Sequence, residues 1–309
     1  MRILITSVGT ATSVNLIKEF RKKGDYVIGV DINPLGYTAG SCLSDKFYQI
    51  AEAVDDNYLP MLSEIIANEK IDVLIPINDI EIYKVSQNID KISCKCVIPD
   101  AETIEMVRDK YICNYKMKEI GIQVPEISPS SRDDKLILRD RIGVGSKGIE
   151  IIPIGKIVPE YNIEEKFLQR FVEGEEYTVD ILADQNGKPL YIIPRKRLEV
   201  KSGVATKVSI ENDSILVNYI KVILDSVKLP GFSNIQFIKD GKGNYWFVEI
   251  NYRFSGCGAA TIAVCKNYID DFKKIVDGRV DFRKINENVK WNTIVTRYYE
   301  ECVYENNIS

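Results

Sequence analysis

The sequence contains no histidine, and this absence excludes several kinds of mechanism. Without an imidazole ring the chain cannot form a Ser-His-Asp or Cys-His nucleophile system, and it cannot bind zinc through histidine. Any chemistry must therefore use carboxylates, amides, arginines and lysines.

Paired cysteines and long apolar runs are also missing. The 7 cysteines are scattered, and only Cys94 and Cys96 lie close together, so neither a disulfide framework nor zinc-ligand spacing is present. No apolar run is long enough to span a membrane, and Met1 leads directly into the strand-like segment "RILITSVG". We therefore expect a cytoplasmic protein with no membrane partner.

Charge of one sign is not concentrated anywhere in the chain. Together, 41 Lys and Arg residues face 45 Asp and Glu residues, which gives a net charge of −4. This balance argues against a nucleic-acid partner. The length of 309 residues leaves room for two or three packed modules.

The first hundred residues alternate strand-like and helix-like segments. We expect strands at 2–7, 26–31, 71–77 and 95–100, and helices at 13–24 and 58–70. This alternation predicts a parallel sheet covered by helices. Asp31 ends the second strand, but the first turn lacks the G-x-G-x-x-G spacing, so a structural α/β layer is favoured over nicotinamide binding.

Two acids, Asp79 and Glu81, follow the strand at 71–77. A ligand at the carboxyl end of a parallel strand explains them, and so does the N-terminus of a helix.

Beyond residue 101 the pattern changes. A helix is expected over 102–119, a polar connector follows at 125–134, and strand-like runs then dominate, interrupted by a helix near 214–227. Antiparallel strands with helices set apart predict an α+β fold for this second part.

Two strand-like runs in "NIQFIKDGKGNYWFVEINYRF", residues 234–254, flank a turn rich in glycine and predict a hairpin. A turn centred near Lys242 sets the index sum of facing residues at about 484, so Gln236 lies opposite or nearly opposite Glu249. Strict alternation places Tyr245, Phe247, Glu249 and Asn251 on one face. The carboxylate and amides offer oxygen ligands to Mg²⁺, and Arg253 can reach a phosphoryl group; a merely solvated polar face is the alternative.

The glycine-rich stretch "LRDRIGVGSKGIE", residues 138–150, suits an approach of backbone N–H groups to an anion, with Ser146 adding a hydroxyl and Lys147 a charge. It does not match the P-loop spacing, and a strand follows where a helix should. Taken alone, an ordinary hairpin loop explains it equally well.

Several motifs in a fixed order carry a resemblance to a known family. "LRDRIGVGSKGI", "LQRFVEGEEYTVDIL", "IQF" and "FVEINYRFSG" resemble the ATP-grasp superfamily, most closely the synthetase modules of the carbamoyl phosphate synthase large subunit. "RDKYICNYKMKEIGIQVPE" and "PRKRLEVKSG" add to the resemblance. It implies a parallel-sheet domain of the pre-ATP-grasp type at 1–100 and an ATP-grasp domain at 101–309. In the latter, a lid spans about 110–172 and a C-terminal body about 173–309.

The resemblance also implies roles for individual residues. Arg139 matches the basic residue that contacts the ATP phosphates from the lid, and Lys110 matches a second basic contact to the nucleotide. Arg253 matches an arginine that stabilises phosphate or the intermediate. The remaining matches are the flap residues Ser146, Lys147 and Gly148; the adenine-facing hinge Gln169, Arg170, Phe171 and Val172; the ribose acid Glu176; the metal ligands Gln236, Glu249 and Asn251; and Arg195, Arg197 and Lys201 near the acceptor. For these last three a solvated charged strand is an equally good interpretation.

Two departures from the family pattern stand out. Asp140 replaces the usual proline and places an acid beside Arg139. Only about ten residues separate Pro125 from "KLILR", where relatives usually carry a helix, so the lid is expected to be trimmed. A small lid buries less apolar surface, and we expect a second copy, another subunit or the acceptor itself to complete the enclosure.

The activity implied by the resemblance is ATP-dependent ligation of a carboxylate to an amine or amino acid through an acyl phosphate, with Mg²⁺ or Mn²⁺. One alternative is phosphorylation of bicarbonate or carbamate, as in carbamoyl phosphate synthase. A second alternative is an ATP-binding partner subunit without turnover.

Overall fold

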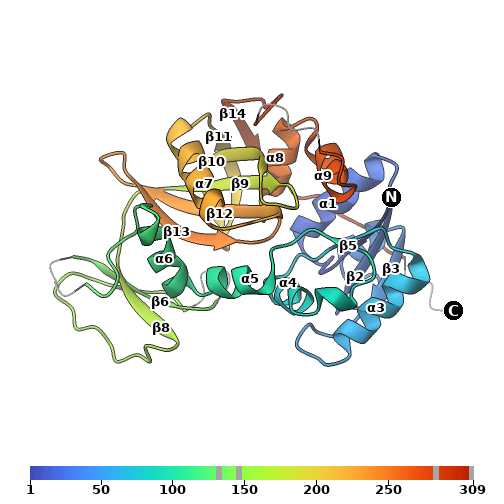
Figure 1. The fold of residues 1–309 in the computed structure, drawn as a ribbon, viewed down its shortest axis with the longest axis horizontal. Helices are drawn as coiled ribbons and strands as arrows, with labels where there is room; N and C mark the ends of the chain where they lie inside the picture. Colours follow the sequence, from blue (N-terminus) through green and yellow to red (C-terminus); the bar gives the residue numbers. More distant parts are fainter. Residues whose placement is uncertain (130–133, 144–147, 281–284, 306–309) are drawn as a thin grey trace.

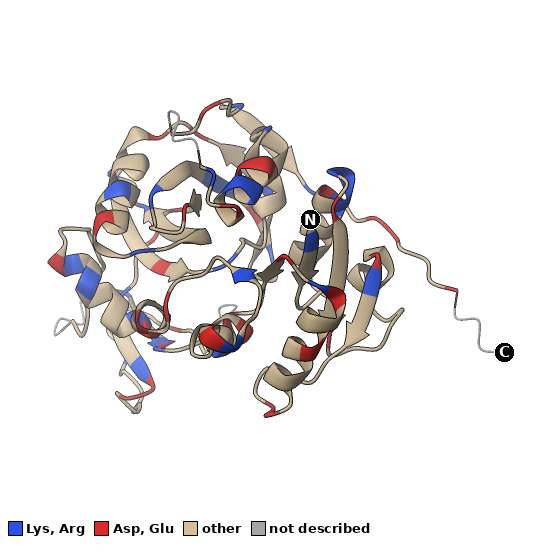
Figure 2. Ribbon diagram, turned by 45° about the vertical axis from the view of Figure 1, so that its right-hand side comes forward, with Lys and Arg blue, Asp and Glu red and all other residues tan. Residues whose placement is uncertain are grey.

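The computed structural model describes residues 1–129, 134–143, 148–280 and 285–305. Figure 1 shows a parallel sheet with its helices on the right, a larger antiparallel sheet at the top, and a small sheet at the lower left. Acidic and basic residues are interspersed over all three parts (Figure 2). No helix among the described residues has both the length and the apolar character needed to cross a bilayer.

The N-terminal sheet is parallel throughout, with strand order β3-β2-β1-β4-β5. Its strands are β1 (Arg2–Ile5), β2 (Tyr26–Asp31), β3 (Lys46–Gln49), β4 (Val73–Ile75) and β5 (Lys95–Cys96). Its helices are α1 (Ala11–Lys22), α2 (Ala39–Leu43), α3 (Tyr58–Glu69), α4 (Asp79–Ser86) and the short η1 (Ile89–Lys91). The strand order reverses between β1 and β4, and such reversals open a crevice at the carboxyl ends of the strands. The expected helix-covered parallel sheet is therefore confirmed.

The helix expected over 102–119 is two helices, α5 (Ala101–Arg108) and α6 (Lys110–Glu119). Asp109 separates them because its backbone is extended, and its side chain accepts hydrogen bonds from the N–H groups of Tyr111 and Ile112. An N-cap of this kind satisfies the first amides of a new helix. The cap fixes the start of α6, where Lys110 is the first residue.

The second part of the chain contains two antiparallel sheets. The larger has strand order β13-β12-β9-β10-β11-β14 and the smaller has β7-β6-β8. The larger sheet comprises β9 (Glu175–Ala183), β10 (Pro189–Lys201), β11 (Val204–Ile210), β12 (Gly231–Lys239), β13 (Tyr245–Asn251) and β14 (Thr293–Thr296). The smaller sheet, β6 (Leu136–Asp140), β7 (Glu150–Ile152) and β8 (Lys166–Arg170), is called the lid sheet below. The helices are α7 (Ser214–Ser226), α8 (Gly258–Val264) and α9 (Tyr268–Val276).

The hairpin β12–β13 has the expected pairing and one irregularity. Gln236 lies opposite Glu249, whereas Phe237 pairs with Phe247, so Val248 is an extra residue in β13. This β-bulge reverses the alternation of side chains. Tyr245, Phe247 and Ile250 consequently share one core with helix α7, while Glu249 and Asn251 lie on the opposite face beside Gln236. The expectation that Tyr245 and Phe247 share a face with Glu249 is therefore wrong.

The N-terminal domain packs against helix α9 through an apolar contact and a charged one. The ring of Phe272 stacks on Phe232 with 4.4 Å between centroids and meets Phe20 of α1 edge-on at 6.1 Å. Beside these rings, the buried carboxylate of Asp25 binds the ammonium of Lys273 at 2.8 Å. The two parts of the chain thus share one continuous core.

Replacing Phe272 by alanine tests this packing. The substitution removes a fully enclosed ring and leaves a cavity, so we expect the free energy of unfolding to fall by about 3 to 5 kcal/mol. Urea denaturation followed by circular dichroism measures the change. Tyr298→Ala is the control, because Tyr298 is 84% exposed and should change the free energy of unfolding by less than ~0.5 kcal/mol. Equal effects of the two substitutions would contradict the packing described here.

Candidate functional site

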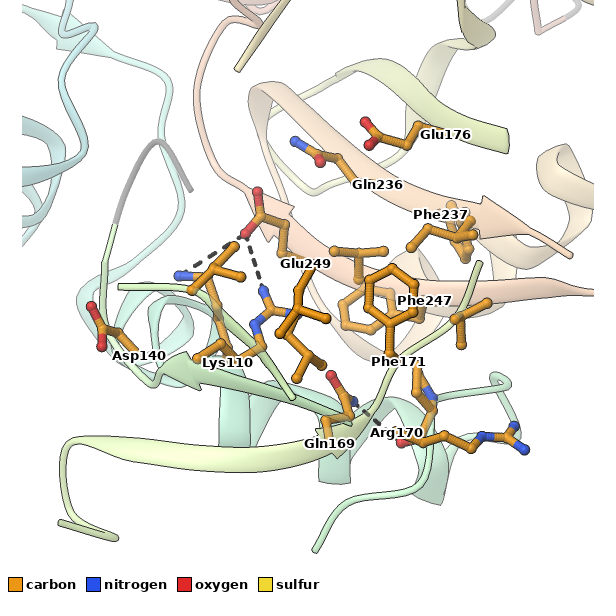
Figure 3. Close-up of a pocket in the computed structure, with 18 of the residues that line it drawn as sticks. Lys110, Asp140, Gln169, Arg170, Phe171, Glu176, Gln236, Phe237, Phe247 and Glu249 are labelled. Carbon is orange, nitrogen blue, oxygen red and sulfur yellow. Dashed lines mark hydrogen bonds and ion pairs between the residues drawn. The ribbon is translucent and has the colours of Figure 1, made fainter. Parts of the chain in front are cut away.

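A cavity of about 270 Å³ lies between the lid sheet and the polar face of the larger sheet (Figure 3). Its polar lining comes from α6, β6, β8 and the strands of the larger sheet, and its apolar lining from those strands, from β7 and from the segments next to β7 and β8. The lining residues used below are Lys110, Pro125, Ile137, Arg139, Asp140, Ile149, Ile151, Gln169, Arg170, Phe171, Val172, Glu176, Arg197, Gln236, Ile238 and Glu249. One site therefore collects residues that are up to 139 positions apart, from Lys110 to Glu249.

Two cations converge on the carboxylate of Glu249. The guanidinium of Arg139 lies 3.6 Å from Glu249 Oε2 and the ammonium of Lys110 lies 4.0 Å from the same atom (Figure 3). Arg139 is 6% exposed, and its Nε has no hydrogen-bond partner among the described residues. Burial lowers the pKa of both Arg139 and Lys110, and the charge of Glu249 opposes that effect. Two desolvated cations that share one carboxylate fit an anion carrying several charges.

Lys110 is attached to the edge of the lid sheet. Its ammonium donates to the carbonyl oxygen of Gly143 at 2.6 Å, and its backbone N–H donates to the carbonyl of Arg141 at 2.8 Å. Arg141 in turn binds Asp109, the cap of α6, with 2.6 Å between Nη2 and Oδ2. The lid sheet and the first turn of α6 therefore form one unit, which places Lys110 and Arg139 on the same side of the cavity.

Oxygen donors line the opposite wall, on the face of the larger sheet that the bulge exposes. Gln236 lies between Thr178 of β9 and Glu249 of β13 in the strand register, and Asn251 donates to Glu249 Oε1 at 3.3 Å. The described residues contain no group of three or more acids, cysteines or histidines able to hold a metal. A divalent ion here would have one carboxylate and amide oxygens, and would complete its coordination with ligand oxygens and water.

The other end of the cavity is apolar. Ile137, Ile149 and Ile151 from the lid sheet and Ile238 from β12 contribute to its lining. Apolar walls with a few polar groups suit a flat, uncharged ring system such as a nucleotide base.

The four predicted hinge residues line this part of the cavity, but two of their side chains are engaged elsewhere. Gln169 is buried and donates to Asn114 Oδ1 at 3.0 Å and to the carbonyl of Pro125 at 3.2 Å. The guanidinium of Arg170 lies over the ring of Trp246 and points away from Glu249 (Figure 3). The backbone N–H groups of Arg170 and Phe171 donate to other backbone carbonyls.

The predicted ribose acid and one predicted acceptor residue form a pair at the rim. Glu176 Oε2 accepts a hydrogen bond from Arg197 Nη1 at 2.6 Å, and Arg197 Nη2 donates to the carbonyl of Gly203 at 2.7 Å. Arg197 thereby links Glu176 to the turn at Gly203.

Arg195 and Lys201 are not among the residues that line the cavity. Arg195 is 1% exposed and forms a two-pronged ion pair with Asp180, with Nε···Oδ2 at 2.7 Å and Nη2···Oδ1 at 2.8 Å. Lys201 is exposed and pairs with Glu199. The structure places neither side chain in this site, and the alternative of a solvated strand is also wrong for Arg195.

Arg253 extends the cluster toward the N-terminal domain. Its Nη2 donates to Asn251 Oδ1 at 3.4 Å, and its Nε donates to both carboxylate oxygens of Asp79, at 3.0 and 3.1 Å. Of the two acids that follow β4, Glu81 is engaged within its own domain: it closes a capping box on α4 and accepts hydrogen bonds from Thr6 and Ser7. Both acids lie in the first turn of α4, as the helix N-terminal interpretation requires, and Asp79 in addition contacts Arg253.

The glycine-rich stretch is described only in part. Ser146 and Lys147 lie outside the described residues. Gly148 has a positive φ of 72°, and a side chain there would collide with the carboxylate of Asp140. Asp140 itself pairs with Lys166 at 3.4 Å. Asp31, the acid that ends β2, accepts a hydrogen bond from the backbone N–H of Gly9 at 2.6 Å, which fits a structural role.

Comparisons with known proteins agree with this architecture. Residues 162–298 match the family described as ATP-grasp in the biosynthetic pathway with Ter operon, and residues 3–99 match the PylC-like N-terminal domain. A D-alanine–D-alanine ligase from Chromohalobacter salexigens is 25% identical over 99 residues, which is 27% of this chain and 30% of that ligase. The match thus spans less than a third of that enzyme's length.

Solved structures share the fold over nearly the whole chain. The biotin carboxylase domain of the 2-oxoglutarate carboxylase from Hydrogenobacter thermophilus, solved with MgADP and bicarbonate, has a TM-score of 0.73 and 15% identity. The alignment covers 95% of this chain and 73% of that one. For the N5-carboxyaminoimidazole synthetase of Staphylococcus aureus the TM-score is 0.71 and the identity 15%, with 96% and 79% covered.

The motifs, the fold and the family matches agree over both parts of the chain. The chain therefore combines a PylC-like N-terminal domain with an ATP-grasp domain, in this order along the sequence.

Proposed function

We propose that this protein joins a carboxylate to an amine at the expense of ATP, through an acyl phosphate. The observation that carries the proposal is the convergence of Lys110 and Arg139 on Glu249, with Gln236 and Asn251 on the same wall and Arg253 beyond them. The arrangement supplies cations for a polyphosphate, oxygen ligands for a divalent ion, and a further guanidinium where an acyl phosphate would form.

The residues present fit ATP and a divalent cation. The isoleucine-lined end of the cavity and the hinge from Gln169 to Val172 would receive the base, Glu176 the ribose, and Lys110 and Arg139 the phosphates. Glu249, Gln236 and Asn251 would hold Mg²⁺ or Mn²⁺, which supplies neutralisation of the phosphate oxygens when bound. The unpartnered, buried Nε of Arg139 supports this assignment, because a buried donor without an acceptor is costly unless a ligand satisfies it.

The protein's contribution to such a reaction is positioning and electrostatics. Lys110 and Arg139 would orient the γ-phosphate so that the substrate carboxylate can attack it, and Arg253 would stabilise the charge that moves onto the acyl phosphate. The amine then displaces phosphate. Alignment of three reactants can supply roughly 7 to 11 kcal/mol of the barrier, so a site without histidine is adequate.

The position of Asp140 does not favour a non-catalytic subunit. Asp140 pairs with Lys166 and packs against Gly148, while Arg139 points to Glu249. Asp140 therefore does not neutralise the arginine that the phosphates would contact.

Glu249→Gln tests the proposed metal ligand. The amide keeps the size of the side chain but removes the charge that would bind the cation, so we expect acid-dependent ADP release to fall by at least ~100-fold. The measurement is a coupled ADP assay with Mg²⁺, screened over amino acids and small carboxylates. Glu160→Gln, an exposed position on the lid, is the control and should retain full activity. Tight ATP binding by the wild type without ADP release under any acceptor would favour the non-catalytic subunit instead.

Lys110→Met and Arg139→Met test the phosphate contacts. Each removes one charged hydrogen bond to the nucleotide, and the dissociation constant for a non-hydrolysable ATP analogue should rise ~10- to 100-fold. Isothermal titration calorimetry measures it, with adenosine as a second ligand whose affinity should not change. Lys156→Met, at an exposed lid position, serves as the matched control. Unchanged affinity in both variants would show that the phosphates bind elsewhere.

A further inference from the structure

A row of polar side chains begins at Glu249 and ends at Asp79. Within the part of the chain that the structure describes, Asp79 is the one residue of the N-terminal domain whose side chain contacts this row. The row runs from Glu249 to Asn251 at 3.3 Å, from Asn251 to Arg253 at 3.4 Å, and from Arg253 to Asp79 at 3.0 Å. Asp79 stands just after β4, beside the point where the strand order reverses. Asp79 is therefore the last member of this row of contacts, which begins at Glu249.

The backbone of Asp79 is positioned by its neighbours, and its carboxylate is oriented by Arg253. Asn78 caps α4, and Glu81, the third residue of the helix, accepts a hydrogen bond from the N–H of Asn78 at 3.2 Å. The side chain of Glu81 is buried and is also bonded to Thr6 and Ser7 at the end of β1. Glu81 is thus unavailable to a ligand, whereas the side chain of Asp79 remains 15% exposed.

The contact between Asp79 and Arg253 leaves hydrogen-bonding groups available on both side chains. A single N–H group, at Nε, serves both oxygens of Asp79, at 3.0 and 3.1 Å. Among the residues that the structure describes, the Nη groups of Arg253 make only long contacts, at 3.4 Å to Asn251 and 3.5 Å to the carbonyl of Phe254. A carboxylate has about four lone-pair sites, and no other donor within the described ranges reaches the oxygens of Asp79. Asp79 thus orients the guanidinium through Nε and leaves the edge formed by Nη1 and Nη2 accessible to a ligand.

The charges of these side chains favour different positions for the acid substrate and the amine substrate. An acid or an acyl phosphate is attracted to the open edge of Arg253 and to Lys110 and Arg139, and is repelled by Asp79. An ammonium group is attracted to Asp79. Arg253 pairs directly with Asp79, the charge of Asp79 also acts on Lys110, and Glu81 lies two residues further along α4. The hydroxyl of Tyr252 donates to the backbone carbonyl of Asp79 at 3.4 Å.

We propose that Asp79 binds the amine substrate and receives the proton that the amine must lose. This inference rests on the proposed ligase function. As the nitrogen attacks the acyl carbon, a C–N bond forms, the C–O bond to phosphate breaks, and the phosphate leaves with the electron pair. An ammonium ion loses two protons overall: one remains on the released phosphate, and one passes through Asp79 to water. Because the chain has no histidine and Glu249 is engaged by two cations, Asp79 is the acid placed to do this.

Asp79→Asn tests the inference, because the amide keeps the size of the side chain and can still accept from Arg253 Nε. The acid that gives most ADP release in the screen described above is combined with one of two kinds of amine. Amino acids and ammonium chloride are protonated at neutral pH, whereas hydroxylamine is uncharged. We expect kcat/KM for the protonated amines to fall ~30-fold, mainly through KM, and hydroxamate formation from hydroxylamine to stay within ~3-fold of the wild type.

Two further variants guard against a purely structural effect. Asp79→Glu retains the charge and should recover part of the activity with protonated amines. Asp56→Asn, at an exposed position of the same domain, should leave both amine reactions unchanged.

The outcomes separate this inference from the ligase proposal. Equal losses with both kinds of amine would show that Asp79 acts through Arg253 or through folding, and no loss with either would show that the amine binds elsewhere; both overturn the inference. A wild type that uses hydroxylamine but no protonated amine also counts against it. A wild type that releases no ADP with any acid overturns the ligase proposal itself.

Discussion

The carboxylate of Glu249 and the two cations that face it determine how the site is organised. Arg139 comes from the lid sheet and Lys110 from the first turn of α6, so the three charges join elements that share no backbone connection nearby. Burial makes both cations costly to keep charged, and the single carboxylate offsets that cost only in part. The site therefore holds an excess of positive charge toward the cavity and a row of amide and carboxylate oxygens behind it.

The same wall depends on one irregular residue in β13. Without the bulge at Val248, Glu249 would share a face with Phe247 and point toward the core under α7. With the bulge, Glu249 and Asn251 join Gln236 and Thr178 on the face that meets the lid sheet. The irregular pairing at Val248 is thus what directs the carboxylate of Glu249 into the cavity.

Much of this arrangement follows from the sequence, and the failures have physical causes. The pairing of Gln236 with Glu249 follows from the turn at Lys242, because a hairpin fixes its own register. The bulge at Val248 does not follow from the sequence, because no glycine or proline marks this position. Strands β11 and β14 were not predicted: β11 mixes buried apolar residues with polar ones without a strict alternation, and β14 is only four residues long and partly exposed. Asp109 is a residue type that commonly caps helices, and it stands just before Lys110. Because the apolar spacing over 102–119 is continuous, the sequence nevertheless predicts one helix there instead of two. The contacts of Arg195 with Asp180 and of Arg253 with Asp79 depend on tertiary packing, which no local pattern records.

The attachment of α6 to the lid sheet has a mechanical consequence. Asp109 binds Arg141, the N–H of Lys110 donates to the carbonyl of Arg141, and the ring of Tyr111 packs edge-on against Phe167 of β8. A displacement of these strands as one body would therefore carry Lys110 together with Arg139. A polyanion bound by both cations would link the lid sheet and α6 to the larger sheet. Release of the polyanion and separation of the two sheets would then occur together.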